Sequence, residues 1–308
     1  MSNLAATAGT ADAPPSQLGI LWRMLLRDRF ALVAAIFLLL VAFGALVGPF
    51  LLGDLATKVN LRQRNLPPFT LEHGILYVLG ADSLGRSLLA RIIVGAQTSL
   101  AISACVVMVS MIVGGTLGIV AGYLGGWTST IIMRLTDVIF SFPSLLMALI
   151  VLYILGPSIL NVIMVLSITR LPIYIRTTRA EVLEIRERMF VSAARALGVS
   201  TPAILLRHIL PVVFPTIITI GAVDFASVLL SESGLSFLGL GIQPPDFTWG
   251  AMVATGRAYL QTAWWLSFWP GLMIMLTTLS LNLLANWARL ASDPQQRWRL
   301  QGKRRQQP

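Results

Sequence analysis

Charged residues are scarce in this chain of 308 amino acids: only 12% are Asp, Glu, Lys or Arg, whereas 56% are hydrophobic. Soluble domains carry about 25% charged residues, and a mean hydropathy of +0.79 is more than a soluble core absorbs. The composition therefore excludes a soluble enzyme. It indicates a polytopic membrane protein, because several charge-free stretches are long enough to cross about 30 Å of hydrocarbon.

Residues that carry metal and redox chemistry are equally scarce. Cys105 is the single cysteine and cannot form an internal disulfide, and His73 and His208 are the two histidines. Structural zinc sites use about four Cys or His ligands, so a typical zinc or redox site is not expected. A membrane-embedded enzyme has little support, because His208 alone supplies neither a nucleophile and base nor a metal cluster. The chain also lacks a Gly-x-x-x-x-Gly-Lys-Ser/Thr phosphate loop, so any ATP must be bound by another chain.

Charge-free segments predict six membrane-spanning helices. The first, residues 30–52, is too long for the apolar region of a cleaved signal peptide, about 7 to 15 residues, so we expect an uncleaved anchor. The others are predicted at about 99–122, 138–155, 159–175 and 212–230, and within 258–288. The third and fourth meet in a hairpin at Gly156-Pro157-Ser158, and Trp264, Trp265 and Trp269 open the sixth as an interfacial belt. The expected fold class is all-α.

Basic residues are unevenly distributed between the two sets of loops. Most of the 23 Lys and Arg residues fall in segments that six spans place on the same side as both termini. The positive-inside tendency makes that side cytoplasmic. The predicted cytoplasmic segments are the tails 1–29 and 289–308 and the loop 177–211; residues 53–97 and 234–263 are extracytoplasmic, and 98–288 form the five-helix core. The net charge of +10 is then a topology signal and requires no nucleic-acid partner.

The loop 177–211 is too patterned for a simple linker. Helical spacing relates five apolar residues, Val182, Ile185, Met189, Ala193 and Ala196, and Glu184 and Arg188 lie four apart on another face. This pattern predicts an amphipathic helix outside the membrane.

A second short helix is predicted after a turn. Gly198 supplies a left-handed residue that closes a helix, Thr201 is the expected N-cap, and Pro202 suits a first helical turn. Such a helix-turn-helix could lie on the lipid surface or insert into a groove of another protein. Its acidic residues, Glu181, Glu184 and Glu187, argue against anionic lipid and favour the protein groove.

Charged residues in or beside the spans are candidates for a pathway or gate. Arg134 and Asp137 lie three apart at a helix start, where we favour a structural ion pair between them. Asp224 lies inside a span, where an acid costs roughly 2.5 to 3.5 kcal/mol at the helix centre; a gating role and a buried interhelical hydrogen bond are equally open. Glu232 is placed at the external end, where solvent alone would satisfy it, and Arg170 is expected to snorkel to the cytoplasmic interface.

Small and turn-forming residues mark two further features. Gly114, Gly118 and Gly122 fall four apart and predict a face on which another helix packs closely. Residues 234–250 combine Gly and Pro with apolar side chains, which is consistent with a re-entrant or scoop-like loop at the outer mouth; an inert interfacial loop is the alternative.

Several segments resemble permease subunits of ABC importers. Ser192-Ala193-Ala194, Gly198 and Leu210-Pro211 resemble the EAA loop of these subunits, with Ser192 where Glu is usual and His208 where Ile is usual. Residues 79–100 and 133–143, and above all Glu232-Ser233-Gly234-Leu235-Ser236-Phe237-Leu238-Gly239-Leu240-Gly241, resemble the C-type permease of dipeptide, oligopeptide and nickel importers. Together these segments cover most of residues 20–295.

The resemblance implies a type I importer fold in the bacterial cytoplasmic membrane and a division of labour between subunits. The EAA-like loop would be a coupling helix that docks on an ATPase, with ATP and magnesium bound by one or two such subunits and no cofactor in this chain. A homologous second permease would supply the other half of the pathway. An extracytoplasmic binding protein would select the cargo, for which the resemblance implies peptides but leaves nickel and glutathione open.

A self-sufficient secondary transporter is the alternative hypothesis. It is disfavoured because the sequence shows neither internal repeats nor many membrane acids.

Overall fold

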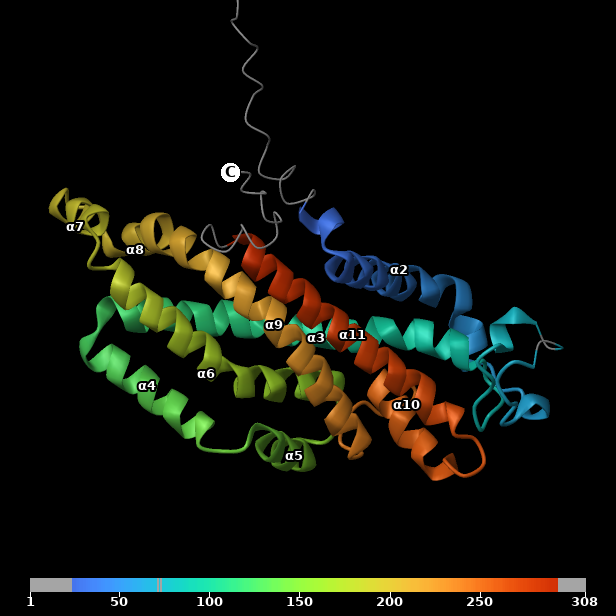
Figure 1. The fold of residues 1–308 in the computed structure, drawn as a ribbon. Coiled ribbons are helices and arrows are strands. Elements are labelled where there is room, and N and C mark those ends of the chain that lie inside the picture. The colour runs from blue at the N-terminus through green and yellow to red at the C-terminus, as the bar shows by residue number, and fades with distance from the viewer. Residues whose placement is uncertain (1–23, 71, 73, 293–308) are drawn as a thin grey trace, which may run out of the picture.

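The molecule is an elongated bundle of helices (Figure 1). The computed structural model describes residues 24–70, 72 and 74–292, so most of the two predicted tails, 1–23 and 293–308, lies outside the described residues. Within these ranges the only extended pairing is an isolated antiparallel bridge between Ala81 and Ser87. The predicted all-α class is confirmed.

Within the described residues, five helices are long and apolar enough to cross a membrane. They are α2 (Arg29–Thr57), α3 (Leu88–Leu124), α6 (Ile159–Ile185), α9 (Leu210–Phe237) and α11 (Trp265–Ser292). Local sequence sets where they begin: Asp28 caps α2 by accepting hydrogen bonds from the backbone N–H groups of Phe30 and Ala31, and Ser158 caps α6 through the N–H of Asn161. These helices correspond to the predicted first, second, fourth, fifth and sixth spans.

The predicted third span, 138–155, is not one continuous helix. The structure has α4 (Gly126–Phe140) and α5 (Ser144–Leu155) in its place, and the two are bent by 85° at the break between them. Pro143 explains the break, because proline has no backbone N–H to donate and disfavours helical geometry in the residue before it. Counted as one broken span, the pair brings the total to six. The predicted turn at Gly156 is confirmed by its φ of +81°.

Helices α3 and α6 pack so closely that three glycines of α3 leave no room for side chains of their own. A Cβ atom added to Gly114, Gly118 or Gly122 would lie 2.7 Å from the Cβ of Tyr174, Thr178 or Val182, respectively, whereas carbon atoms in contact are about 3.5 to 4.0 Å apart. All three partners on α6 are fully buried. The glycine face predicted from the sequence is therefore the contact face for α6.

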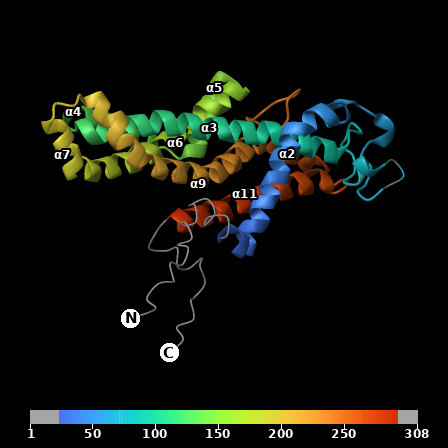
Figure 2. The ribbon, with the colours of Figure 1, turned by 90° about the horizontal axis from the view of Figure 1, so that it is seen from above.

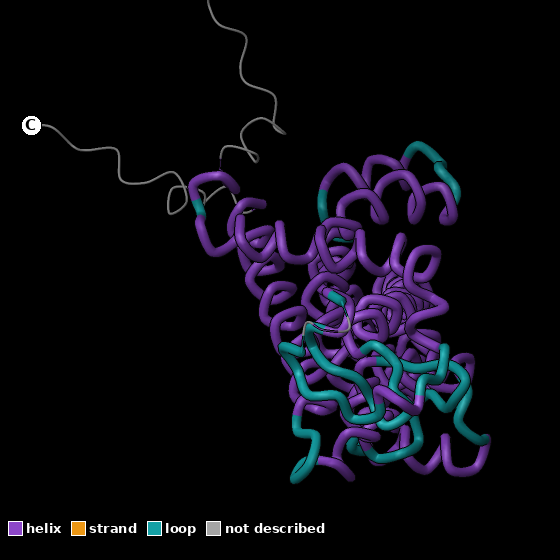
Figure 3. Tube along the Cα trace, turned by 90° about the vertical axis from the view of Figure 1, so that its right-hand side faces the viewer, coloured by secondary structure: helices purple, strands orange, loops and turns teal. Residues whose placement is uncertain are grey.

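The two ends of the bundle carry different structures. One end bears the short helices α7 (Met189–Ala196) and α8 (Thr201–Ile204), and the opposite end bears the segment 58–87 and the short helix α10 (Trp249–Gly256) (Figures 1 and 2). These are called here the α7–α8 end and the α10 end. Figure 3, which looks onto the α10 end, shows that loops gather there.

Two tryptophans fix the α10 end. Trp249 is fully buried, its Nε1 donates to the carbonyl of Ile92 at 2.8 Å and its backbone N–H to Ser99 Oγ at 3.0 Å, so α10 is held against α3. Trp265 is only 7% exposed and its Nε1 donates to the carbonyl of Ala81. The predicted interfacial belt is thus wrong for Trp265, which joins the core because the segment 58–87 folds over the start of α11.

Gly118→Ala should destabilise the bundle, whereas Gly53→Ala should not. A Cβ at residue 118 meets the Thr178 Cβ at 2.7 Å and the Ile175 carbonyl oxygen at 2.9 Å, while one at residue 53, in helix α2, meets nothing within 4 Å. Overpacking typically costs about 1 to 3 kcal/mol, and alanine itself is the better helix former. Thermal unfolding of the detergent-solubilised protein measures the difference. Equal melting temperatures for the two variants would contradict the close contact.

Candidate functional site

The α7–α8 end differs from the single amphipathic helix predicted there. Helix α6 runs on to Ile185, the chain breaks over residues 186–188, and α7 begins at Met189. Val182 and Ile185 are buried, but Met189 is 89% exposed, so the predicted apolar stripe is not one face. The break explains the difference, because it turns α7 to a new direction. The predicted ion pair between Glu184 and Arg188 is confirmed at 2.8 Å.

The turn between the two short helices follows the prediction closely. Gly198 has φ +77°, and the N–H of Val199 donates to the carbonyl of Ala194, as in the glycine-closed helix ends known as Schellman motifs. Pro202 lies in the first turn of α8, as predicted, but the N-cap is Ser200 and not Thr201.

One face of α7 is anchored and another is exposed. Val191 and Ala194 are buried in a core cluster with Ile204, Ile209 and residues of α6 and α9. The exposed side carries Met189, Ala193 and Leu197 at successive intervals of four, and Leu197 is 83% exposed. Residues four apart lie on one helical face. These three residues are called here the exposed α7 row.

The remaining predicted loop residues take different positions. Ser192 and Pro211 are exposed, Leu210 is half-buried at the start of α9, and His208 is half-buried with its ring 6.5 Å from that of Phe190. His208 belongs to a π-helical turn, Leu205–Ile209, that joins α8 to α9. The loop therefore continues into a long helix of the bundle without a flexible joint.

Two arginines that the sequence did not single out tie this end to α3. Arg186 donates to the carbonyl of Gly122 at 3.1 Å, and Arg195 donates to the hydroxyl of Tyr123 and lies over its ring at 5.5 Å. Their sequence signal is only a basic residue near a helix end, which is common on protein surfaces.

A buried polar cluster joins α6 to α9 in the middle of the bundle. The Asp224 side chain is 5% exposed; its Oδ1 lies 3.6 Å from Arg170 Nη1, and its Oδ2 accepts a hydrogen bond from the Tyr174 hydroxyl at 3.1 Å. Arg170 also donates to the carbonyl of Ser227 and to Ser231 Oγ. The interhelical hydrogen bond considered for Asp224 is therefore present. The snorkelling predicted for Arg170 is wrong, because its guanidinium contacts three residues of α9, namely Asp224, Ser227 and Ser231.

The ion pair predicted between Arg134 and Asp137 is also wrong. Asp137 pairs with Arg176 of α6 at 2.7 Å, Arg176 lies over the Phe140 ring, and Arg134 is exposed. Helix α4 starts at Gly126, so these residues lie well inside the helix and not at its start, and α6 approaches on the side of Asp137. Because both partners are about half exposed, the pair contributes little stability.

Glu232 is buried and not solvated as the sequence suggested. It has no exposed surface, and its Oε1 accepts a hydrogen bond from Ser236 Oγ, which lies 3.4 Å from Thr248 Oγ1. Helix α9 continues past Glu232 to Phe237, and α10 packs over that end. Among the described residues, no group of three or more His, Cys, Asp and Glu is placed to hold a metal ion.

Two family models match the chain. Residues 114–298 match the binding-protein-dependent transport system inner membrane component. Residues 16–68 match the N-terminal TM domain of oligopeptide transport permease C. With the apolar helices, these matches indicate a multi-pass protein of the inner membrane.

Curated relatives match along almost the whole chain. The di/tripeptide transport system permease protein of Pseudomonas aeruginosa is 39% identical over 91% of this chain and 93% of its own. The glutathione transport system permease protein of Pectobacterium atrosepticum is 36% identical over 89% of each chain. The probable D,D-dipeptide transport system permease protein of Escherichia coli K12 is 34% identical over 89% of this chain and 90% of its own. The secondary-transporter alternative is thereby set aside, and the chain belongs to the permease subunits of ABC importers, among the C-type permeases of the peptide group.

Proposed function

We propose that this permease forms half of the translocation pathway for short peptides. We also propose that a separate ATPase subunit docks on the exposed α7 row and drives the permease through that contact. Permeases of this family act with ATPase and binding-protein partners in general. The observation that carries the assignment of α7 is its combination of an exposed apolar row with a buried, anchored reverse face. Unpaired apolar rows of this kind fit a groove on a partner protein.

The anchoring contacts would transmit movement of α7 into the bundle. Val191 and Ala194 pack in the same cluster as Ile204 and Ile209, which lead directly into α9, and as Val182 near the end of α6. Arg186 and Arg195 add contacts to the end of α3. A push on α7 therefore reaches three long helices through packed side chains, and well-packed interiors transmit such strain because they compress little.

Ala193→Arg should weaken binding of the ATPase, whereas Ala258→Arg should leave it unchanged. Both alanines are exposed, but Ala193 belongs to the α7 row and Ala258 lies at the α10 end. An arginine in the docked interface adds bulk and an unpaired buried charge, which costs about 3 to 5 kcal/mol in protein interiors. Ala194 is unsuitable for this test because it is only 7% exposed and packs inward.

The measurement is co-purification of the ATPase with each variant, together with ATP-driven peptide uptake in proteoliposomes. Wild-type association for Ala193→Arg would refute the docking assignment. Tighter association of that variant with anionic vesicles, together with unchanged ATPase binding, would show a lipid-surface helix instead.

The relatives, and the lack of a phosphate loop in this chain, support the proposed cargo and partners. The relatives' names refer to di- and tripeptides, glutathione and D,D-dipeptides, and their shared chemistry is a short peptide, which we take as the cargo class. ATP and magnesium would be bound by one or two separate subunits, because this chain has no phosphate loop. A homologous permease would supply the other half of the pathway, and an extracytoplasmic binding protein would deliver the peptide.

The α7–α8 end is assigned to the cytoplasm, with both termini on that side. In a Cys105→Ser background, Ser200→Cys should be protected from an impermeant thiol reagent on intact cells, whereas Gln261→Cys at the opposite end should react. Both residues are exposed, so burial does not confuse the comparison. Labelling at residue 200 in intact cells, with protection at residue 261, would contradict this assignment and indicate the opposite topology.

The Arg170–Asp224 pair is proposed as a gate contact, because it joins α6, which continues toward α7, to α9. Asp224→Asn should destabilise the complex by leaving Arg170 without its counter-charge, by about 1 to 3 kcal/mol, below the value for a fully buried pair because Arg170 is partly exposed. Tyr174→Phe is the milder comparison, since it removes one hydrogen bond, worth about 0.5 to 1.5 kcal/mol.

A double variant separates a gate from a structural contact. Arg170→Met combined with Asp224→Leu removes both charges, so thermal stability should recover relative to Asp224→Asn. If the pair gates the pathway, this variant still shows altered basal ATP hydrolysis and peptide uptake in the assembled complex. Wild-type hydrolysis and uptake would assign the pair to stability alone.

A further inference from the structure

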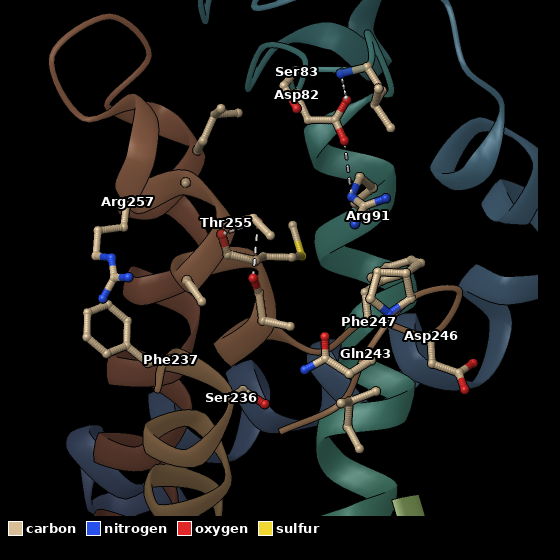
Figure 4. Close-up of a pocket in the computed structure, with 18 of the residues that line it drawn as sticks. Asp82, Ser83, Arg91, Ser236, Phe237, Gln243, Asp246, Phe247, Thr255 and Arg257 are labelled. Carbon is tan, nitrogen blue, oxygen red and sulfur yellow. Dashed lines mark hydrogen bonds and ion pairs between the residues drawn. The ribbon is translucent and has the colours of Figure 1, made fainter. Parts of the chain in front are cut away.

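A cavity of about 540 Å³ lies at the α10 end, away from the α7–α8 end and from the Arg170–Asp224 pair (Figure 4). Its walls come from residues 82–86, the start of α3, the end of α9, the connection between α9 and α10, α10 with the turn that follows it, and Leu266 of α11. Cavities that bind small molecules span about 300 to 1,000 Å³ and combine apolar walls with a few polar groups. This cavity has the size and the mixed lining of such a site.

Two arginines lie on opposite sides of the cavity (Figure 4), each stacked on an aromatic ring. The guanidinium of Arg91 is 4.1 Å from the centre of the Phe247 ring, and that of Arg257 is 5.1 Å from the centre of the Phe237 ring. Stacking on a ring holds a guanidinium in place while leaving its N–H groups free at the edge. Arg91 also donates from Nη1 to the carbonyl of Ala56 at 3.2 Å. Among the described residues its Nη2 has no hydrogen-bond partner and, like the guanidinium of Arg257, can donate to a ligand in the cavity.

The acidic residue Asp82 in the cavity wall pairs with Arg86 and Arg91 but not with Arg257. Asp82 is occupied locally: its Oδ1 accepts from the N–H groups of Leu84 and Arg86, and its Oδ2 from Arg86 Nε at 2.7 Å. Arg91 also forms an ion pair with Asp82, with its Nε 3.6 Å from Oδ2. Among the described residues, no carboxylate lies within 4.0 Å of Arg257. With three arginines against Asp82 and Asp246 in the lining, the cavity has an excess of positive charge.

The walls are fixed before any ligand arrives. Trp249 holds α10 against α3 through its two hydrogen bonds, and Thr248 caps α10 by accepting from the N–H of Ala251. Gln243 donates to the carbonyls of Gly239 and Gly241, which braces the connection from α9. A preformed site avoids the cost of ordering its walls on binding.

We infer that this cavity binds the carboxylate end of a short peptide. The carboxylate would accept hydrogen bonds from Arg257 and Arg91, and the side chain of the last residue would lie against the apolar wall that includes Phe237 and Leu266. Guanidinium groups match carboxylates in shape and charge. The identity of the ligand as a peptide rests on the cargo class proposed above, whereas its anionic character rests on the cavity alone.

The test uses the importer complex, purified with its co-expressed subunits but without the binding protein, in nanodiscs of phosphatidylcholine. Binding of alanyl-phenylalanine and of its C-terminal amide is measured by saturation-transfer NMR for the wild type, Arg257→Gln, Arg257→Lys and the control Arg62→Gln. Arg257 and Arg62 are both exposed at the α10 end, but Arg62 does not line the cavity.

The wild type and Arg62→Gln should bind the carboxylate form about tenfold more tightly than the amide, as expected for one charge-assisted contact. Arg257→Gln should lose this preference and Arg257→Lys should keep part of it. Equal binding of the two forms by the wild type, or an unchanged preference in Arg257→Gln, would overturn the inference. Displacement of the dipeptide when phosphatidylglycerol replaces part of the phosphatidylcholine, with no carboxylate preference, would also overturn it and assign the arginines to a lipid phosphate.

Peptide uptake by the wild-type importer, measured with its binding protein present, tests the proposed function separately. Normal uptake without binding at the cavity would defeat only this inference. Carboxylate binding without any peptide uptake would defeat the proposed cargo and leave the anion site standing.

Discussion

The close approach of α3 and α6 determines where the functional parts of this permease lie. With glycine at residues 114, 118 and 122, the α3 backbone accepts the side chains of Tyr174, Thr178 and Val182 directly. In lipid, where helices gain little from hydrophobic burial against each other, such close packing is a main source of association. It fixes the position and rotation of α6, and α6 carries Arg170 on one side and continues into the α7–α8 end.

The charges buried in the bundle follow from that rotation. Tyr174 meets Gly114 through its Cβ and reaches Asp224 with its hydroxyl, so one residue takes part in both the helix contact and the polar cluster. A carboxylate at this depth is tolerated because Arg170 and Tyr174 satisfy it. The packing of α3 against α6 and the burial of an acid on α9 therefore depend on the same residue of α6, Tyr174.

The sequence predicted features that depend on local chemistry and failed where distant segments decide. Charge-free runs predict the long helices, the spacing of small residues predicts the α3 face, and the position of Gly198 predicts a left-handed turn residue. Arg170 and Glu232 were misplaced because their surroundings come from elements far along the chain: Ser227 and Ser231 of α9 for the first, and α10 for the second. The cavity beside Arg91 and Arg257 has no sequence signal, since its walls bring residues 82–91 together with residues 236–266, which lie far apart in the chain.

The break between α4 and α5 has a consequence for the surroundings of the bundle. Ser141, Phe142 and Pro143 are exposed where the two helices bend by 85°, and a break of this kind interrupts the regular backbone hydrogen bonds of a helix. Hydrocarbon offers no partners for freed backbone groups, so irregular segments at membrane depth lie against protein or water and not against lipid tails. Within a membrane, the exposed break between α4 and α5 therefore favours contact with protein or water over contact with lipid tails.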